Sequence, residues 1–262
     1  MPKLLVGGRG GSGKSTLVTL LARRLGEKER VLVVDADESN LGLGTMLNLQ
    51  PPEKTLMDHL GGKPAVREKL MAAIRGQGDE VIQLFAEKIT LDNLPEECMY
   101  REGQVAWMQV GKIEHVMEGC ACPMGALARA FLNHLAVGDG EWVLVDTEAG
   151  VEHFGRGVLE GVDAVLMVVD PSHDAVVLAE KAASLAREAK KDFGVALNKV
   201  DEKTEPVLKE MLAAKGIEIK GVFPYSPAIA RASLLGGPLE GGTMQEEVDR
   251  LVSWIEEMLK RN

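Results

Sequence analysis

A glycine-rich loop near the start of the chain carries residues that could bind a phosphate group. It spans residues 8–16, reads GRGGSGKST, and lies between an apolar run at 3–6 and a helix-like leucine pattern at 17–25. The glycines let successive backbone N–H groups turn inward around a phosphate, and the helix N-terminus adds its positive dipole end. Lys14 would bridge the outer phosphates, and the Ser15 hydroxyl would bind Mg²⁺. The residues predicted to contact the nucleotide are Gly10, Gly11, Ser12, Gly13, Lys14, Ser15 and Thr16.

Three aspartates follow apolar, strand-like runs further along the chain. Asp35 and Asp37 come after the run at 30–34, and Asp146 comes after the run at 142–145. Ligands of open α/β sheets bind at the carboxyl ends of the strands, where these side chains would project. Asp146 is predicted to hold a magnesium-bound water, with Asp35 supporting the metal's water shell. Asp37 is predicted to orient the attacking water, because phosphoryl transfer depends mainly on positioning and charge stabilisation.

A C-x-C motif, Cys120-Ala121-Cys122, could hold one soft or borderline metal ion, such as zinc. Two thiolates supply only half of a four-ligand shell. A two-fold dimer axis near the pair would supply the same cysteines again, which predicts a homodimer that shares one metal. Pro123 suits the first position of a helix, so Cys122 would cap it with a lowered thiol pKa. The other interpretation is a pair of packed small residues; Cys98 is not expected to bind the metal.

The elements that must position these residues alternate between strands and helices. Strands are predicted at 3–6, 30–34, 104–111, 142–145, 164–169, 194–197 and 217–223, and helices at 17–25, 66–73, 124–137, 174–190 and 244–260. This alternation predicts an α/β protein, a P-loop NTPase with a doubly wound, largely parallel sheet flanked by helices. A single domain is expected over residues 1–262. The stretch at about 50–123, which carries the C-x-C motif, is expected to leave the core sheet.

Composition narrows the classes of partner. The 262 residues carry a formal net charge of −10, which argues against a nucleic acid partner because Lys and Arg are not in excess. No apolar run has the length of a membrane span, and the last predicted helix is acidic and poorly suited to anionic lipid. The N-terminus does not look like a signal peptide, and three cysteines do not make a disulfide framework. A cytoplasmic protein is therefore expected.

The glycine-rich loop resembles the deviant P-loop, K-G-G-x-G-K-[ST], of the MinD-type ATPases. The resemblance implies a nucleotide-switched dimer in which an extra lysine of the loop reaches the partner's nucleotide. Arg9 occupies the position of that lysine, so it would act across the dimer or else lie solvated at the loop edge. The same comparison implies that Asn198 reads adenine through its amide, flanked by Pro224 and Ser226. A buried structural asparagine is the competing interpretation.

Two further stretches resemble signatures of the CooC family, the accessory ATPases for nickel insertion into carbon monoxide dehydrogenase. They are residues 119–123 (GCACP) and 148–157 (EAGVEHFGRG). This resemblance implies ATP, Mg²⁺ and Ni²⁺ as ligands, a homodimer whose C-x-C pairs meet at the interface, and carbon monoxide dehydrogenase as the client. Acetyl-CoA synthase is the alternative client. An iron–sulfur reductase and a positioning ATPase are the other classes that this sequence leaves open.

Overall fold

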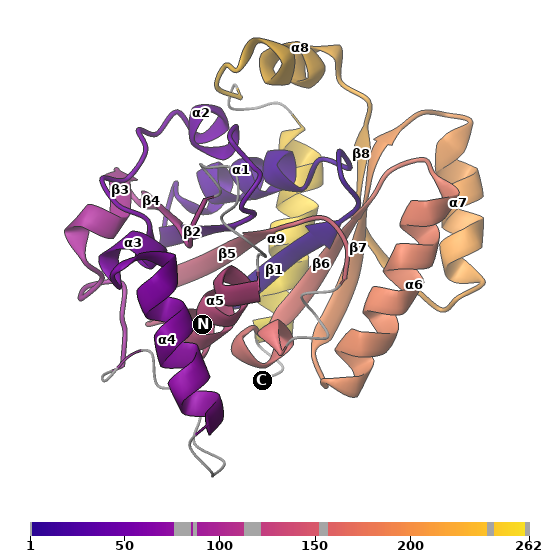
Figure 1. Ribbon diagram of the computed structural model, residues 1–262. Coiled ribbons are helices and arrows are strands. Elements are labelled where there is room, and N and C mark those ends of the chain that lie inside the picture. The colour runs from indigo at the N-terminus through magenta and orange to yellow at the C-terminus, as the bar shows by residue number, and fades with distance from the viewer. Residues whose placement is uncertain are drawn as a thin grey trace.

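The computed structural model describes residues 2–75, 85, 88–112, 122–151, 157–239 and 244–259, and within them one eight-stranded sheet forms the centre of the molecule (Figure 1). Its spatial order is β3-β4-β2-β5-β1-β6-β7-β8. The strands are β1 (Lys3–Gly8), β2 (Arg30–Ala36), β3 (Met99–Glu102), β4 (Val105–Gln109), β5 (Glu141–Thr147), β6 (Ala164–Val169), β7 (Asp192–Val200) and β8 (Ile219–Pro224). All neighbouring strands pair in parallel except β3, which is antiparallel to β4.

Helices cover both faces of this sheet. They are α1 (Lys14–Leu25), α2 (Leu43–Leu47), α3 (Leu56–His59), α4 (Gly62–Arg75), α5 (Cys122–His134), α6 (His173–Glu188), α7 (Thr204–Ala213), α8 (Pro227–Leu235) and α9 (Gln245–Leu259). Buried side chains of α1, α2 and α9 share one core cluster, whereas those of α4 to α7 share the cluster on the opposite face. Figure 1 shows α8 apart from both layers, at the top of the molecule, and none of its residues is buried.

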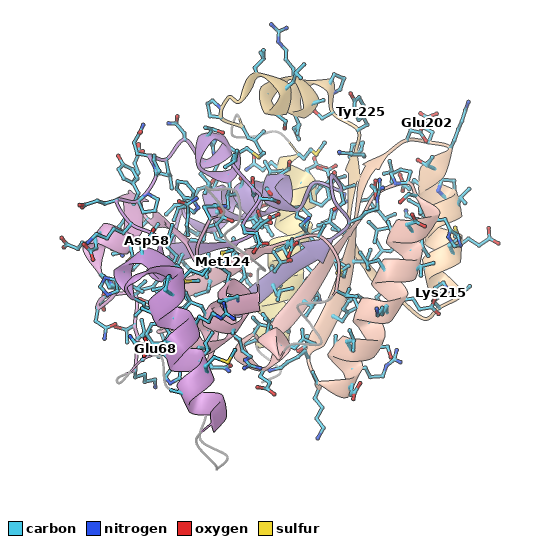
Figure 2. The ribbon with its side chains drawn as sticks, viewed as in Figure 1. Asp58, Glu68, Met124, Glu202, Lys215 and Tyr225 are labelled. Carbon is cyan, nitrogen blue, oxygen red and sulfur yellow. The ribbon has the colours of Figure 1, made fainter. Side chains whose placement is uncertain are left out.

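The strands alternate between the two cores residue by residue. Leu4 and Val6 of β1 belong to the cluster under α1, while Leu5 between them belongs to the cluster under α5 and α6. This period of two follows from the pleat, which points successive side chains to opposite faces. A strand covered on both faces is apolar throughout, as β1 and β6 are. In Figure 2, Met124 of α5 lies in the interior, and Glu68 of α4 lies toward the outside of the molecule.

The predicted fold class is confirmed: the chain forms a largely parallel, doubly wound α/β sheet of the P-loop NTPase type. Strand β6 spans the predicted residues, and the predicted strands at 3–6 and 30–34 continue to Gly8 and Ala36. The expectation that the stretch after residue 50 leaves the sheet is wrong for 99–109. Strand β4 pairs in register with β2, and β3 forms the sheet edge. No helix among the described residues is long and apolar enough to cross a bilayer.

Candidate nucleotide-binding site

The glycine-rich loop joins the end of β1 to the start of α1, as predicted, and its backbone requires glycine at particular positions. Gly11 and Gly13 have φ angles of 75° and 102°, in the left-handed region that side chains disfavour. A Cβ on Gly13 would lie 2.1 Å from Nδ2 of Asn198. The loop closes through a hydrogen bond from the Ser12 N–H to the Arg9 carbonyl at 3.1 Å. A side chain at Gly13 would therefore strain the loop and displace its neighbour.

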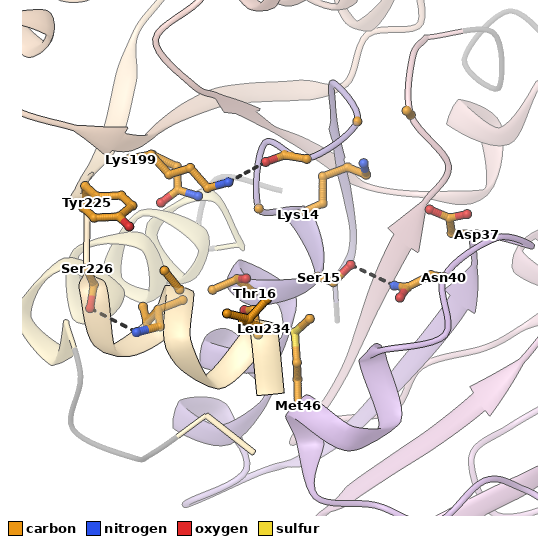
Figure 3. A pocket seen from close by; sticks show the side chains of 18 of the residues that line it. Lys14, Ser15, Thr16, Asp37, Asn40, Met46, Lys199, Tyr225, Ser226 and Leu234 are labelled. Atoms are coloured by element: carbon orange, nitrogen blue, oxygen red, sulfur yellow. Dashed lines mark hydrogen bonds between the residues drawn. The ribbon is translucent and has the colours of Figure 1, made fainter. Parts of the chain in front are cut away.

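Three side chains from different parts of the chain, Ser15, Asn40 and Asp146, meet at the first turn of α1. The Ser15 hydroxyl donates to Oδ2 of Asp146 at 2.6 Å. The Asn40 amide donates to Ser15 Oγ at 2.8 Å and to the same Asp146 oxygen at 3.0 Å. The Lys14 ammonium lies on the other side of the turn, 3.4 Å from the Arg9 carbonyl. Figure 3 shows Lys14, Ser15, Asp37 and Asn40 around one part of the cavity.

Asp146 is the buried carboxylate of this cluster. The residue is fully buried, and its Oδ1 makes no hydrogen bond in the structure. Burial raises the pKa of Asp146 to about 7, against the hydrogen bond from Ser15, which lowers it. An unpartnered buried carboxylate oxygen beside a hydroxyl is a donor set that suits a hard divalent cation such as Mg²⁺. The chemistry of Ser15 and Asp146 thus fits the predicted magnesium site.

Asp35 is buried as well, but it is paired. Its Oδ2 accepts from the Lys112 ammonium at 2.7 Å, and its Oδ1 accepts from the Asp37 N–H at 3.1 Å. Burial raises the pKa of Asp35 to about 6, while Lys112 acts to lower it. Asp35 also pairs in register with Asp146 across β2 and β5. Asp37 lies further along the same loop and lines the cavity, and its Oδ1 accepts from the Ser39 N–H at 2.9 Å.

A cavity of about 740 Å³ extends from the glycine-rich loop to the ends of β7 and β8. Gly10, Gly11, Gly13, Lys14, Ser15, Thr16, Asp37, Asn40, Asn198, Lys199, Pro224, Tyr225 and Ser226 are among the residues that line it. Most of the predicted nucleotide contacts therefore share one cavity. Figure 3 shows Lys199, Tyr225 and Ser226 on the side away from Asp37. Leu234 and Met46 lie between the two sides, below Thr16 in this view.

Asn198 has a structural bond in addition to its place on the cavity wall. Its amide donates to the Ser12 carbonyl at 2.7 Å, and the residue is buried. Its neighbour Lys199 donates to the Gly11 carbonyl, also at 2.7 Å. Strand β7 thus holds two carbonyls of the glycine-rich loop, which favours the orientation of the loop's N–H groups toward the cavity. The Ser226 hydroxyl accepts from the Ile229 N–H at 3.3 Å and caps α8.

Arg9 forms an ion pair within its own chain. Its guanidinium donates through Nε and Nη2 to the two oxygens of Asp170, at 3.2 and 2.7 Å. The Asp170 side chain is 11% exposed; although its burial acts to raise the pKa of the carboxyl, the hydrogen bond and charge of Arg9 lower it. The expectation of an arginine that is only solvated at the loop edge is therefore wrong.

The C-x-C motif is described only in part. Cys120 lies outside the described residues, and of Cys122 only the backbone is described. That backbone begins α5 at Cys122, one residue before the predicted start at Pro123, so Cys122 belongs to the first turn rather than capping it. Cys98 is buried, and burial raises the pKa of its thiol to about 11. Among the described residues, no group of three or more His, Cys, Asp and Glu is placed to hold a metal.

Sequence reasoning assigned no role to four residues that the structure places at or behind the site: Asn40, Lys112, Asp170 and Lys199. Three of them have a shared signal, because Lys112, Asp170 and Lys199 are polar residues at or just beyond the carboxyl end of an apolar strand. Such positions meet at the ligand-binding edge of a parallel sheet. Their partners lie far away in sequence and could not be identified from it.

Comparison with known proteins gives a consistent family. Residues 3–239 match the model of the CobQ/CobB/MinD/ParA nucleotide binding domain. An uncharacterized ATP-binding protein of Methanocaldococcus jannaschii is 38% identical over 90% of this chain and 93% of its own. The carbon monoxide dehydrogenase accessory protein CooC of Rhodospirillum rubrum is 29% identical over 89% of this chain and 88% of its own. The septum site-determining protein MinD of Pyrococcus horikoshii, solved with Mg-ADP, superposes with a TM-score of 0.69 at 19% identity, covering 99% of this chain and 98% of its own.

Proposed function

Since the chain belongs to the CobQ/CobB/MinD/ParA nucleotide-binding family, we propose that this MinD/ParA-type ATPase couples hydrolysis of Mg-ATP to delivery of nickel into carbon monoxide dehydrogenase. The observation that carries the ATPase part is the contact of Ser15 with Asp146 beside Lys14, at the start of α1. Similarity to CooC and the C-x-C motif support the nickel part. Acetyl-CoA synthase is the alternative client.

The side chains around α1 divide the work of hydrolysis. The loop N–H groups and Lys14 hold the phosphates, and Ser15 and Asp146 would hold Mg²⁺, which supplies neutralisation of phosphate charge. Asp35, which pairs in register with Asp146 across β2 and β5, is proposed to support the water shell of that Mg²⁺. Asp37 orients a water toward the terminal phosphorus; the water's oxygen bonds to phosphorus as the bond to the leaving oxygen of ADP breaks. Asn198, Pro224 and Ser226 are proposed to surround the adenine.

Arg9 is proposed to act on the nucleotide of a partner subunit. The Arg9 side chain is 44% exposed, so a nucleotide bound to a partner subunit could reach it. It must first exchange the two carboxylate contacts of Asp170 for phosphate contacts. Arginine suits this exchange, because its planar fork binds carboxylate and phosphate oxygens alike.

Nickel is proposed to be the cargo, held by Cys120 and Cys122 of two subunits. One chain offers two thiolates, and a second copy completes four sulfur ligands, so metal binding should drive dimerisation. Anaerobic titration with nickel, followed by sizing, should saturate at one metal per two chains. Cys120→Ser and Cys122→Ser should abolish tight binding.

Cys98→Ser is the matched control, because Cys98 is buried with a raised thiol pKa and should leave the titration unchanged. One metal per chain on a stable monomer would contradict the shared site and remove the main support for nickel delivery. That result would not contradict the proposed ATPase activity, because ATP hydrolysis can be measured without nickel.

A further inference from the structure

Lys112 is a buried lysine whose ammonium makes three hydrogen bonds to the end of β2 and the loop that follows it. Its side chain is 7% exposed. Nζ donates to Oδ2 of Asp35 at 2.7 Å, to the Asp37 carbonyl at 2.6 Å and to the Asn40 carbonyl at 2.6 Å. An ammonium has three N–H donors, so Lys112 uses one on Asp35 in β2 and the other two on the loop that follows this strand. The lysine itself follows β4, between 72 and 77 residues further along the chain.

The bonds to the carbonyls determine which way the loop faces. Asp37 and Asn40 direct their carbonyl oxygens toward Lys112, while both residues line the nucleotide cavity. Within the loop, the backbone bond from the Asn40 N–H to the Asp37 carbonyl is long, at 3.3 Å. Figure 3 shows the Asn40 side chain directed at Ser15, with Asp37 above it. Lys112 thus supports the loop from behind the face that meets the nucleotide.

Neutralising Asp35 explains only part of this arrangement. A buried carboxylate needs a compensating charge, and one contact from the ammonium would provide it. The bonds to Asp37 and Asn40 are not needed for that purpose. They are short, they join residues of the loop that faces the cavity, and they occupy the two donors that remain.

We propose that Lys112 is a positioning residue for ATP hydrolysis: it holds the loop so that the Asp37 carboxylate faces the cavity and the Asn40 amide reaches Ser15 and Asp146. This inference rests on the ATPase function and is independent of nickel. Among the described residues, the Lys112 ammonium donates to Asp35, Asp37 and Asn40, and it donates to no group of the glycine-rich loop, β7 or β8. Its loss should therefore lower kcat and leave the affinity for ATP nearly unchanged.

The test compares Lys112→Met in an Asp35→Asn background with Asp35→Asn alone. In that background no buried carboxylate is left unpaired, so folding is protected, and a role limited to neutralising Asp35 predicts no loss of kcat. A positioning role predicts a fall in kcat of about tenfold or more, because misplaced reacting groups are costly, with the Kd for ATP changed by less than about threefold. Equal kcat in the two proteins, together with equal hydrogen exchange of their residues 37–41, would overturn the proposal.

Lys3→Met is the matched control. Lys3 donates to the Leu132 carbonyl at 2.6 Å from the end of β1 opposite the glycine-rich loop. Its loss should lower stability and leave kcat unchanged. Hydrogen exchange at residues 37–41 gives a readout that does not need turnover, and Lys112→Met should exchange faster there. Absence of turnover in the wild-type chain would overturn the ATPase function, whereas unchanged exchange in the variant would overturn the role of Lys112 alone.

Discussion

Asp37 is placed so that its carboxylate could be needed for hydrolysis of ATP and not for binding of ATP. It lines the cavity, and one of its oxygens already accepts from Ser39. Asp37→Asn keeps an oxygen for Ser39 and removes the charge that is proposed to orient the water. We expect ATP to bind with nearly unchanged Kd, while kcat falls by about 10²-fold or more. Phosphate release and equilibrium binding of ATP measure the two quantities.

Two further variants serve as controls for Asp37→Asn. Lys14→Ala should weaken both binding and turnover, because its ammonium is proposed to hold the phosphates. Asp192→Asn removes an exposed carboxylate at the start of β7 and should change neither. If Asp37→Asn hydrolyses ATP at the normal rate, the water is oriented by another group.

Asp146 should make the stability of the protein depend on pH. Its pKa is raised by burial to about 7 in the folded protein, whereas an unfolded chain releases that proton near its ordinary value. Between these two values the folded state holds more protons, so stability falls as pH rises. Asp35, raised to about 6, acts in the same direction.

Urea denaturation without nucleotide and with a chelator checks this dependence. From about pH 5 to about pH 8 the wild type should lose on the order of 4 kcal/mol of unfolding free energy, of which Asp146 accounts for the larger part. Asp146→Asn carries no titrating group at this position and should lose clearly less. The same pH dependence in wild type and variant would exclude Asp146 as its source.

At the scale of elements, α2 is held against β4 by a close contact between a glycine and an aromatic ring. A Cβ on Gly44 would lie 2.4 Å from two carbons of the Trp107 ring, which is buried. Gly44→Ala should therefore force the ring or the helix to move, at a cost of about 1–3 kcal/mol in unfolding free energy. Gly42→Ala is the control, because its nearest neighbour is the flexible end of Met46 at 3.4 Å. Chemical denaturation measures both, and equal stability of the two variants would contradict the contact.

This contact also shows why sequence patterns predict some elements and miss others. Strands β1 and β6 are apolar on both faces, so their composition alone marks them as buried. Helix α2 has only five residues, and its place depends on the ring of Trp107. Helix α8 buries no residue, although Ile229 and Ala232 pack against the core under α1, so no stripe of fully buried residues marks its bounds. The sequence pattern also does not predict helix α7 or the edge strand β3.

The candidate site likewise contains residues that the sequence predicts and contacts that it does not predict. The glycine-rich loop and the strand-end aspartates are visible in the sequence, because local spacing defines the first and strand boundaries the second. The ion pair of Arg9 with Asp170 joins residues 161 positions apart, and Lys112 reaches Asp35 over 77. Only the order of the strands brings such partners together. The function of the C-x-C motif remains a prediction from the sequence.

At the scale of the whole molecule, the site is assembled from strands that are distant along the chain. Strand β1 lies between β5 and β6, with Lys3 opposite Val143 and Leu4 opposite Ala164. A chain that ends before β6 lacks one neighbour of β1, the partner of Arg9 and the whole of β7 and β8. We expect such a chain to bind no ATP, as measured by equilibrium binding, while the full chain does. Tight binding by the truncated chain would show that the loop and α1 suffice.

The central place of β1 has a consequence for the order of events during synthesis. The glycine-rich loop is among the first residues to be synthesised. The strands on both sides of β1 are β5 and β6, which comprise residues 141–147 and 164–169 and leave the ribosome much later. Pairing over such distances must wait for the later strands and is intrinsically slow. The loop that is proposed to bind the nucleotide is thus among the first parts to be translated and among the last to become able to bind it. Nascent chains should therefore compete for ATP only near the end of their translation.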